Sequence, residues 1–229
     1  MKRTVSSISP PHWQRLAALF PLILVCGCQA LGPVLSPHPN FYALTDARET
    51  TTSAAPRAVA MVLATAPTLV VSPSHAAAGF DSQRIMYLRR ANQLEYFAHN
   101  EWIDTPARML TPLIVAAVEA SGAFRAVVQT PSAVTGDMRL DTEILRLQHE
   151  FLDAPSRVRF TLRAYLVESG TRRVMASREF EAVVPAASDD PYAGVVAGNR
   201  AVRAVLDELS AFCAESARSA PGARAPAAK

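Results

Sequence analysis

Two cysteines near the N-terminus stand where thiol chemistry could occur. They close the stretch Val25-Cys26-Gly27-Cys28, which ends the apolar run 16–25. A cysteine thiolate can attack a lipid donor to form a thioether, and small residues before it give a peptidase access to the preceding bond. These residue types make Cys28 a candidate nucleophile and the bond between Gly27 and Cys28 a candidate cleavage site.

The segment before Cys28 has the parts of a secretory signal peptide, which we expect to span residues 1–27. It carries three basic residues and no acidic one, and its apolar run is ten residues long. Signal peptides have apolar runs of about 7–15 residues, whereas a membrane-spanning helix needs about 20. With the cysteine that follows, the segment resembles a bacterial lipobox. The resemblance implies cleavage between Gly27 and Cys28, and a diacylglycerol and an acyl chain such as palmitate on Cys28. Gln29 replaces the aspartate that retains lipoproteins at the inner membrane, so the resemblance implies a periplasm-facing anchor in the outer membrane of a Gram-negative bacterium.

The composition argues against a disordered chain and against a nucleic-acid partner. Half of the 229 residues are hydrophobic and 19% are charged, which is typical of a folded domain. The formal net charge is +3, but three of the 23 Lys and Arg residues lie in residues 1–27, and the remainder equals the 20 Asp and Glu residues. The processed chain would be formally neutral, so we expect it to bind no nucleic acid.

Other reactive side chains form no recognisable constellation. The histidines after the signal peptide lack metal-ligand spacing: His38, His75, His99 and His149. G-x-S-x-G and glycine-rich phosphate loops are also lacking. We therefore expect no enzymatic activity, no metal and no cofactor beyond the lipid on Cys28. His99 beside Glu101 and Asp104 could act as an acid or base, but we favour an exposed histidine.

Two further sites have both a chemical and a structural interpretation. Asp189 and Asp190 could form a carboxylate pair, but the proline that follows them favours a helix cap. Cys213 would be the one free thiol after processing, because Cys26 leaves with the signal peptide and Cys28 is acylated. Since Cys213 lies on the apolar side of a predicted helix, we favour a buried thiol over a reactive one.

Hydrophobic periodicity predicts an α/β fold with α+β character, in which two amphipathic helices pack on a mixed, largely antiparallel sheet in a single domain. We expect a tether over 28–40, the domain over 41–216 and a disordered tail over 217–229. One helix begins at Pro106 and contains Pro112, which should kink it or move its start to Thr111. The other begins after Asp190. The predicted strands are 41–44, 58–63, 69–71, 84–88, 94–97, 124–128, 138–151 (with a bulge near 144), 157–166 and 174–182.

Two features of these elements invite a functional interpretation. Arg157, Arg159 and Arg163 alternate with apolar residues along one strand, which favours a solvated sheet face over an anion or headgroup site. Trp102 lies just before the first helix and could fix the start of that helix on the sheet, or could anchor a partner protein or an acyl chain. We favour the structural interpretation of both. Gly198, on the apolar face of the second helix, indicates either close packing on the sheet or a poorly formed first turn.

An ordered set of short motifs resembles the ABC-type transport auxiliary lipoprotein family, which includes paraquat-inducible protein C. The resemblance runs from about residue 41 to 213, after the lipobox cysteine. Its motifs are Tyr42-x-Leu44, Phe80-Asp-Ser-Gln-Arg-Ile-Met-Tyr87, Leu94-x-Tyr96, Glu101-Trp-Ile-Asp-Thr-Pro106, Phe124-Arg-Ala-Val-Val128 and Asp137-Met-Arg-Leu-Asp141.

The resemblance implies a non-catalytic role beside a mammalian-cell-entry (MCE) domain protein, in an ABC system that carries lipids across the cell envelope. It also implies possible homo-oligomerisation, and it makes the stretch with Glu101, Trp102, Asp104 and Pro106 a candidate docking site for the partner. Glu101 stands where the family commonly has arginine. The alternative is a structural or assembly lipoprotein of the outer membrane without a transport partner; a lipoprotein hydrolase would need a nucleophile that the sequence does not reveal.

Overall fold

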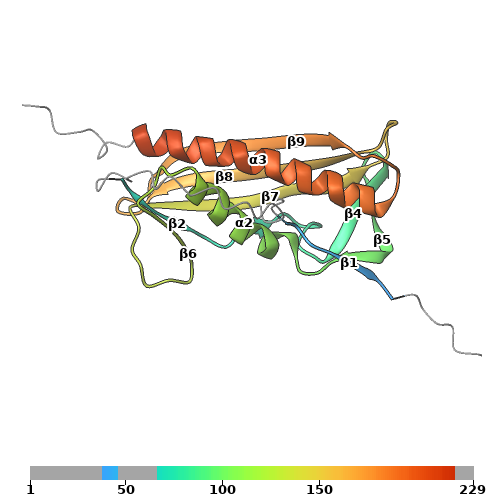
Figure 1. The fold of residues 1–229 in the computed structure, drawn as a ribbon, viewed down its shortest axis with the longest axis horizontal. Helices are drawn as coiled ribbons and strands as arrows, with labels where there is room; N and C mark the ends of the chain where they lie inside the picture. The colour runs from blue at the N-terminus through green and yellow to red at the C-terminus, as the bar shows by residue number, and fades with distance from the viewer. Residues whose placement is uncertain (1–37, 46–65, 220–229) are drawn as a thin grey trace, which may run out of the picture. The chain divides into compact units, whose positions relative to one another are not determined.

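Within the residues that the computed structural model describes, 38–45 and 66–219, nine strands form one sheet and two helices lie on one of its faces (Figure 1). This confirms the predicted fold class. The strand expected at 58–63 lies outside the described residues. The elements are β1 (Asn40–Tyr42), β2 (Thr68–Val71), β3 (His75–Ala76), β4 (Arg84–Arg90), β5 (Gln93–Trp102), α2 (Pro106–Ala120), β6 (Ala126–Gln129), β7 (Met138–Glu150), β8 (Arg157–Glu168), β9 (Val174–Pro185) and α3 (Pro191–Ser219).

Strand β7 is the centre of the sheet. Along one of its edges it pairs in turn with β2, β3 and β4, all parallel to it, and its other edge pairs with β8, which is antiparallel. Strand β9 lies beyond β8, β6 lies beyond β2, and β5 and then β1 lie beyond β4. The sheet is therefore mixed. Its longest pairings are the antiparallel β7–β8 pair and the antiparallel β8–β9 hairpin, and the alternating pattern predicted the hairpin.

A bulge in β7 reconciles two hydrophobic patterns within one strand. Its pairing with β8 shifts register between Ile144 and Arg146, so that Ile144 before the shift and Leu147 after it are both buried in the core. An extra residue in one strand exchanges the faces on which the following side chains lie. The predicted bulge near residue 144 is confirmed.

Helix α2 begins at Pro106 and continues through Pro112, so the expectation that the helix might start at Thr111 is wrong. Pro106 occupies the first turn, where its missing N–H has no intrahelical partner to lose. Thr111 is buried, and its hydroxyl donates to the Ala107 carbonyl at 3.1 Å while accepting from the Ser74 N–H at 3.0 Å. The side chain next to the proline thus connects the helix to the segment between β2 and β3.

Helix α3 packs on β8 and β9. Its backbone comes closest to the sheet at Gly194, and not at Gly198 as the sequence suggested. A Cβ on Gly198 would meet Val158 at 3.7 Å, an ordinary contact, whereas a Cβ on Gly194 would overlap the His149 ring, 2.9 Å from its Cε1. The first turns of α3 are regular, so a poorly formed start is also excluded. The helix continues to Ser219, three residues beyond the predicted end of the domain at 216.

Cys213 lies fully buried on the inner side of α3, and burial raises the pKa of its thiol to about 12. Only the thiolate reacts with alkylating agents. We expect native protein at pH 8 to be alkylated at Cys213 at least about 1,000-fold more slowly than the urea-unfolded chain, measured by mass spectrometry with iodoacetamide. Equal rates would show that the core around α3 opens readily.

Candidate docking site

The candidate docking residues lie where β5 ends and α2 begins. Glu101 and Trp102 are the last two residues of β5, and Pro106 is the first of α2. This stretch is held on both sides, because the Trp102 N–H donates to the Gln83 carbonyl and the Ile103 N–H donates to the Tyr42 carbonyl, each at 2.7 Å. The other predicted site residues, Gly27 and Cys28, lie outside the described residues.

Trp102 belongs to the core. Its side chain is 3% exposed and lines a cavity of about 10 Å³ together with Leu147, Val158 and Val195. This volume holds about one water molecule. An aromatic anchor must reach the partner's surface, so the burial of Trp102 favours the structural interpretation. Within the same stretch the more accessible side chains are those of Glu101, Ile103 and Asp104.

Asp104 contributes to the start of α2. Its Oδ1 accepts from the Thr105 N–H at 2.7 Å, and its Oδ2 lies 3.3 Å from Arg108 Nε, one helical turn later. Thr105 is the N-cap residue by position, but its side chain makes no capping hydrogen bond. Pro106 is buried. Glu101 is therefore the candidate docking residue for which the structure shows no other role.

Next to Glu101 the structure shows a group of exposed apolar residues that sequence reasoning missed. Large apolar side chains at 40–65% exposure lie on β1, on β5 or directly after it, and in the first turn of α3: Phe41, Leu94, Tyr96, Ile103 and Tyr192. We call this group the β1-end patch. Leu94 and Tyr96 alternate with Glu95. This spacing indicates a strand, but it does not show that the apolar side of the strand is exposed.

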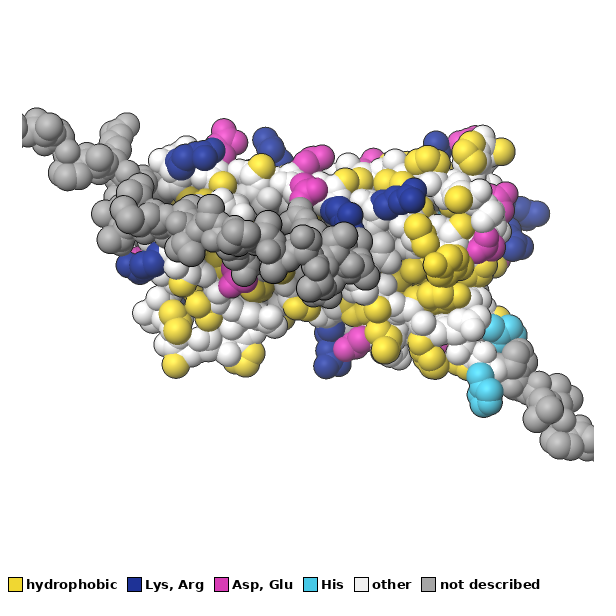
Figure 2. Space-filling view, in the orientation of Figure 1, with side chains coloured by type: hydrophobic (Ala, Val, Ile, Leu, Met, Phe, Trp, Pro, Cys, Tyr) yellow, Lys and Arg dark blue, Asp and Glu magenta, His cyan; other side chains and the backbone are white. Residues whose placement is uncertain are grey.

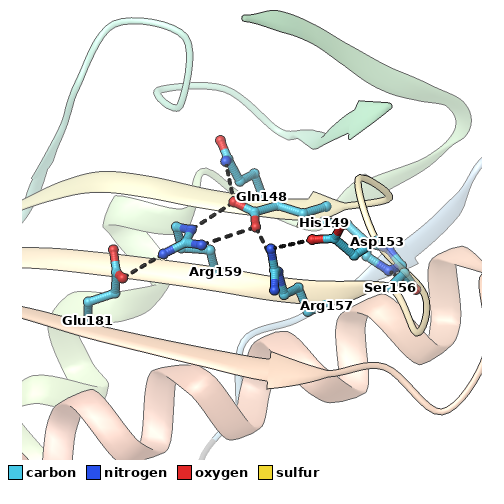
Figure 3. A network of polar contacts seen from close by, with 8 residues as sticks. Gln148, His149, Asp153, Ser156, Arg157, Arg159 and Glu181 are labelled. Carbon is cyan, nitrogen blue, oxygen red and sulfur yellow. Dashed lines mark hydrogen bonds and ion pairs between the residues drawn. The ribbon is translucent and has the colours of Figure 1, made fainter. Parts of the chain in front are cut away.

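The arginine row lies on the sheet face away from the helices, and each arginine meets carboxylates. Arg159 lies between Glu150 (2.7 Å) and Glu181 (2.5 Å), and Arg163 lies between Glu143 and Glu179 at 3.3–3.4 Å. Figure 3 shows the part of this network around Glu150. Arginines whose charge is already matched are poor anion ligands, so the geometry supports a solvated, ion-paired face.

Glu150 is the buried centre of that network. Its side chain is 4% exposed and also bonds Arg157 (3.3 Å) and the Gln148 amide (2.9 Å). Burial alone would raise the pKa of its carboxyl, but the hydrogen bonds from Arg159 and Gln148 outweigh burial, and the pKa lies below its usual value. Glu150 is therefore charged at neutral pH and holds two strands together through its partners.

His149 and Ser156 form a hydroxyl–imidazole pair that could suggest a nucleophile with its base. The His149 Nε2 lies 3.0 Å from the Ser156 Oγ. Both side chains are buried, and the His149 Nδ1 has no hydrogen-bond partner, so no carboxylate orients the ring. Ser156 is only 1% exposed, and we interpret the pair as a structural contact beneath α3.

The carboxylates at the start of α3 act as the sequence predicted. Asp190 Oδ1 accepts from the Ala193 N–H at 2.9 Å and its Oδ2 meets the Ser188 hydroxyl, and these bonds hold the pKa of Asp190 below its ordinary value. This is a helix cap. Among the residues that the structure describes, no three His, Cys, Asp or Glu side chains come together as metal ligands.

The buried His149 makes folding dependent on pH. Burial lowers the pKa of its imidazole below 6.5, against a smaller opposing effect of Asp189 and Asp190. Below pH 6.5 the unfolded chain therefore binds a proton that the folded chain does not, and stability is lost as the pH falls. We expect this residue to contribute a slope of at most about 1.4 kcal/mol per pH unit in urea unfolding from pH 7 to 5, and His149→Gln to flatten it. An unchanged slope in the variant would assign the effect elsewhere.

Within residues 38–45 and 66–219, neither helix combines the length and apolar character needed to cross a bilayer. In a comparison with protein families, the model of the ABC-type transport auxiliary lipoprotein component matches residues 42–210. That range holds the whole sheet from the end of β1 onward and most of α3.

Several solved structures are similar to this chain, including the following two. Protein XCC0632 from Xanthomonas campestris is 26% identical to this chain, with a TM-score of 0.63, and the match covers 67% of this chain and 87% of that chain. An uncharacterised protein is 14% identical, with a TM-score of 0.56 and coverage of 78% and 98%. A search of curated proteins finds no match.

Proposed function

The chain belongs to the ABC-type transport auxiliary lipoprotein family, and from this we propose that it serves an MCE-type ABC system that moves lipids across the cell envelope. The family match carries the proposal, because it spans the sheet and most of α3 in one domain that follows a lipobox. Membership makes the protein a transport auxiliary lipoprotein of the envelope. The family's role is in transport, and we propose no catalytic step.

We propose that Cys28 is the attachment point, with cleavage after Gly27 and sorting to the outer membrane. The sequence supports this through the ten-residue apolar run, the small residue before Cys28 and the Gln29 that follows it. Two or three acyl chains on one cysteine would suffice for stable anchoring, since a single chain binds only reversibly.

Replacing Cys28 by serine tests the anchor. We expect wild-type protein to sediment with membranes and to carry a mass increase on Cys28, and Cys28→Ser to appear in the soluble fraction or to keep its signal peptide. Cys213→Ala is the matched control, because it removes the other remaining thiol and should stay in the membrane. Sedimentation of Cys28→Ser with its signal peptide removed would contradict lipid anchoring.

The partner is tested by gentle detergent extraction of the full-length protein from its own membranes, with mass spectrometry of bound proteins and lipids. We expect recovery of an MCE-domain protein and a weaker yield with Glu101→Lys, which reverses charge at the candidate docking stretch. A matched Glu179→Lys variant, on the ion-paired face, should retain the yield. Recovery of a barrel or cell-wall protein without an MCE component would favour the structural alternative, and recovery of tagged copies of the chain itself would reveal homo-oligomers.

A further inference from the structure

The sheet face that the helices leave uncovered has two halves of different chemistry. Over β7, β8 and β9 the face carries the arginine–carboxylate pairs. Over β4, β5 and β1 it carries apolar groups, since Met86 is in register with Tyr96, and Leu88 with Leu94. Cross-strand partners point to the same face of a sheet, so these four side chains form one surface.

Strand β1 extends this apolar surface to the edge of the sheet. Phe41 and Arg84 are both in register with Glu101, and the Arg84 guanidinium lies 4.0 Å above the Tyr96 ring. Phe41 is thus on the same face as Tyr96. The pairing between β4 and β5 shifts register at this point. The five-residue step from Tyr96 to Glu101 in β5 lies opposite the two-residue step between Met86 and Arg84 in β4. Tyr96 is therefore brought close to β1.

The other side of the same edge is apolar as well. Tyr42, the next residue of β1, points toward α3, where its ring lies 6.4 Å from the exposed ring of Tyr192. Figure 2 shows hydrophobic side chains gathering there, where β1 meets the first turns of α3. Because apolar groups flank β1 on both faces, this edge could enter an apolar medium end-on.

The chain that joins β1 to Cys28 indicates that this apolar medium is a lipid bilayer. Eleven residues separate Cys28 from Asn40, where β1 begins, and twelve extended steps of at most about 3.6 Å each span about 43 Å in all. A lipid on Cys28 would therefore keep β1 close to a bilayer. Arg84, Arg89 and Arg90 are exposed on strand β4, and basic residues beside aromatic ones suit the interface between headgroups and acyl chains.

We propose that the β1-end patch inserts into the headgroup region of the bilayer that holds Cys28, which gives the domain a fixed orientation on the membrane. This rests on the lipid anchor of the proposed function. Helix α3 begins at the patch and has 29 residues, so its far end lies about 43 Å along the helix. A cleft of about 590 Å³ between that end and the start of β9 then faces away from the bilayer.

The test uses full-length lipidated protein in vesicles of phosphatidylethanolamine and phosphatidylglycerol, in a Cys213→Ala background. A fluorophore is attached at Tyr96→Cys or Ile103→Cys in the patch, and at Tyr165→Cys as the control, because Tyr165 is an exposed tyrosine of β8. The vesicles contain a headgroup-attached nitroxide quencher. We expect quenching at 96 and 103 to exceed that at 165 at least about twofold.

Each other outcome decides against the proposal. Equal quenching at the three positions, with the protein still floating with the vesicles, would leave the lipid anchor intact and overturn the insertion of the patch. Crosslinking of the patch to a protein in native envelopes, with no quenching in vesicles, would make it a protein-docking surface. A chain that fails to float would overturn both the anchor and the insertion.

Discussion

Replacing Trp102 by alanine is expected to lower the free energy of unfolding by about 3–5 kcal/mol, the usual cost of removing a buried tryptophan. The side chain is 3% exposed and lies between the sheet and the first turns of α3, beside Val195 and Gly198. Those neighbours belong to a regular helix and a continuous sheet, so they have little freedom to fill the space. Urea unfolding followed by far-ultraviolet circular dichroism measures the loss.

The neighbouring residue provides the matched control. Ile103 is also apolar but 60% exposed, so Ile103→Ala should change stability by less than about 0.5 kcal/mol. Equal effects of the two substitutions would show that Trp102 is not part of the core. The difference also matters for mapping a partner. Lost binding in Trp102→Ala would report a damaged domain, whereas lost binding in Glu101→Lys would report the docking surface.

The sequence predicted best those elements whose two faces differ in polarity. Strand β8 alternates Val158, Phe160 and Leu162 with arginines, and its return strand follows the same pattern, so the hairpin and its buried face followed directly. The bulge in β7 was also predictable, because a change of phase within one strand has few structural solutions. The candidate docking site was predicted less well, because an alternating pattern does not show whether Trp102 lies in the core or on the surface.

Tertiary proximity accounts for what the sequence could not show. Gly194 and Gly198 lie one turn apart on the same helix face, and only the position of His149, 45 residues earlier in the chain, decides which glycine is needed. The β1-end patch likewise joins residues of β1, β5 and α3 that are far apart in sequence. Local periodicity describes one element at a time, so it cannot distinguish an apolar residue facing the core from one facing a bare sheet edge.

Replacing Glu150 by alanine is expected to cost about 3 kcal/mol, within the range for breaking a buried ion pair. The carboxylate is almost inaccessible, and its loss leaves Arg157 and the Gln148 amide without their bonds to it, while Arg159 keeps only Glu181. Glu179→Ala is the matched control on the same face. Glu179 is half exposed and meets Arg163 at 3.3 Å, so its loss should cost less than about 1 kcal/mol.

The charge of Glu150 can be separated from its shape by measuring Glu150→Gln across pH. Because the pKa of Glu150 is lowered on folding, its charge stabilises the protein above about pH 4.5, and this contribution is lost as the pH falls toward the folded pKa. The stability difference between wild type and Glu150→Gln should therefore be constant from pH 7 to 5 and shrink below that, while the slope from His149 is common to both and cancels. A difference that persists undiminished in acid would mean that shape and hydrogen-bond geometry, and not charge, hold this network together.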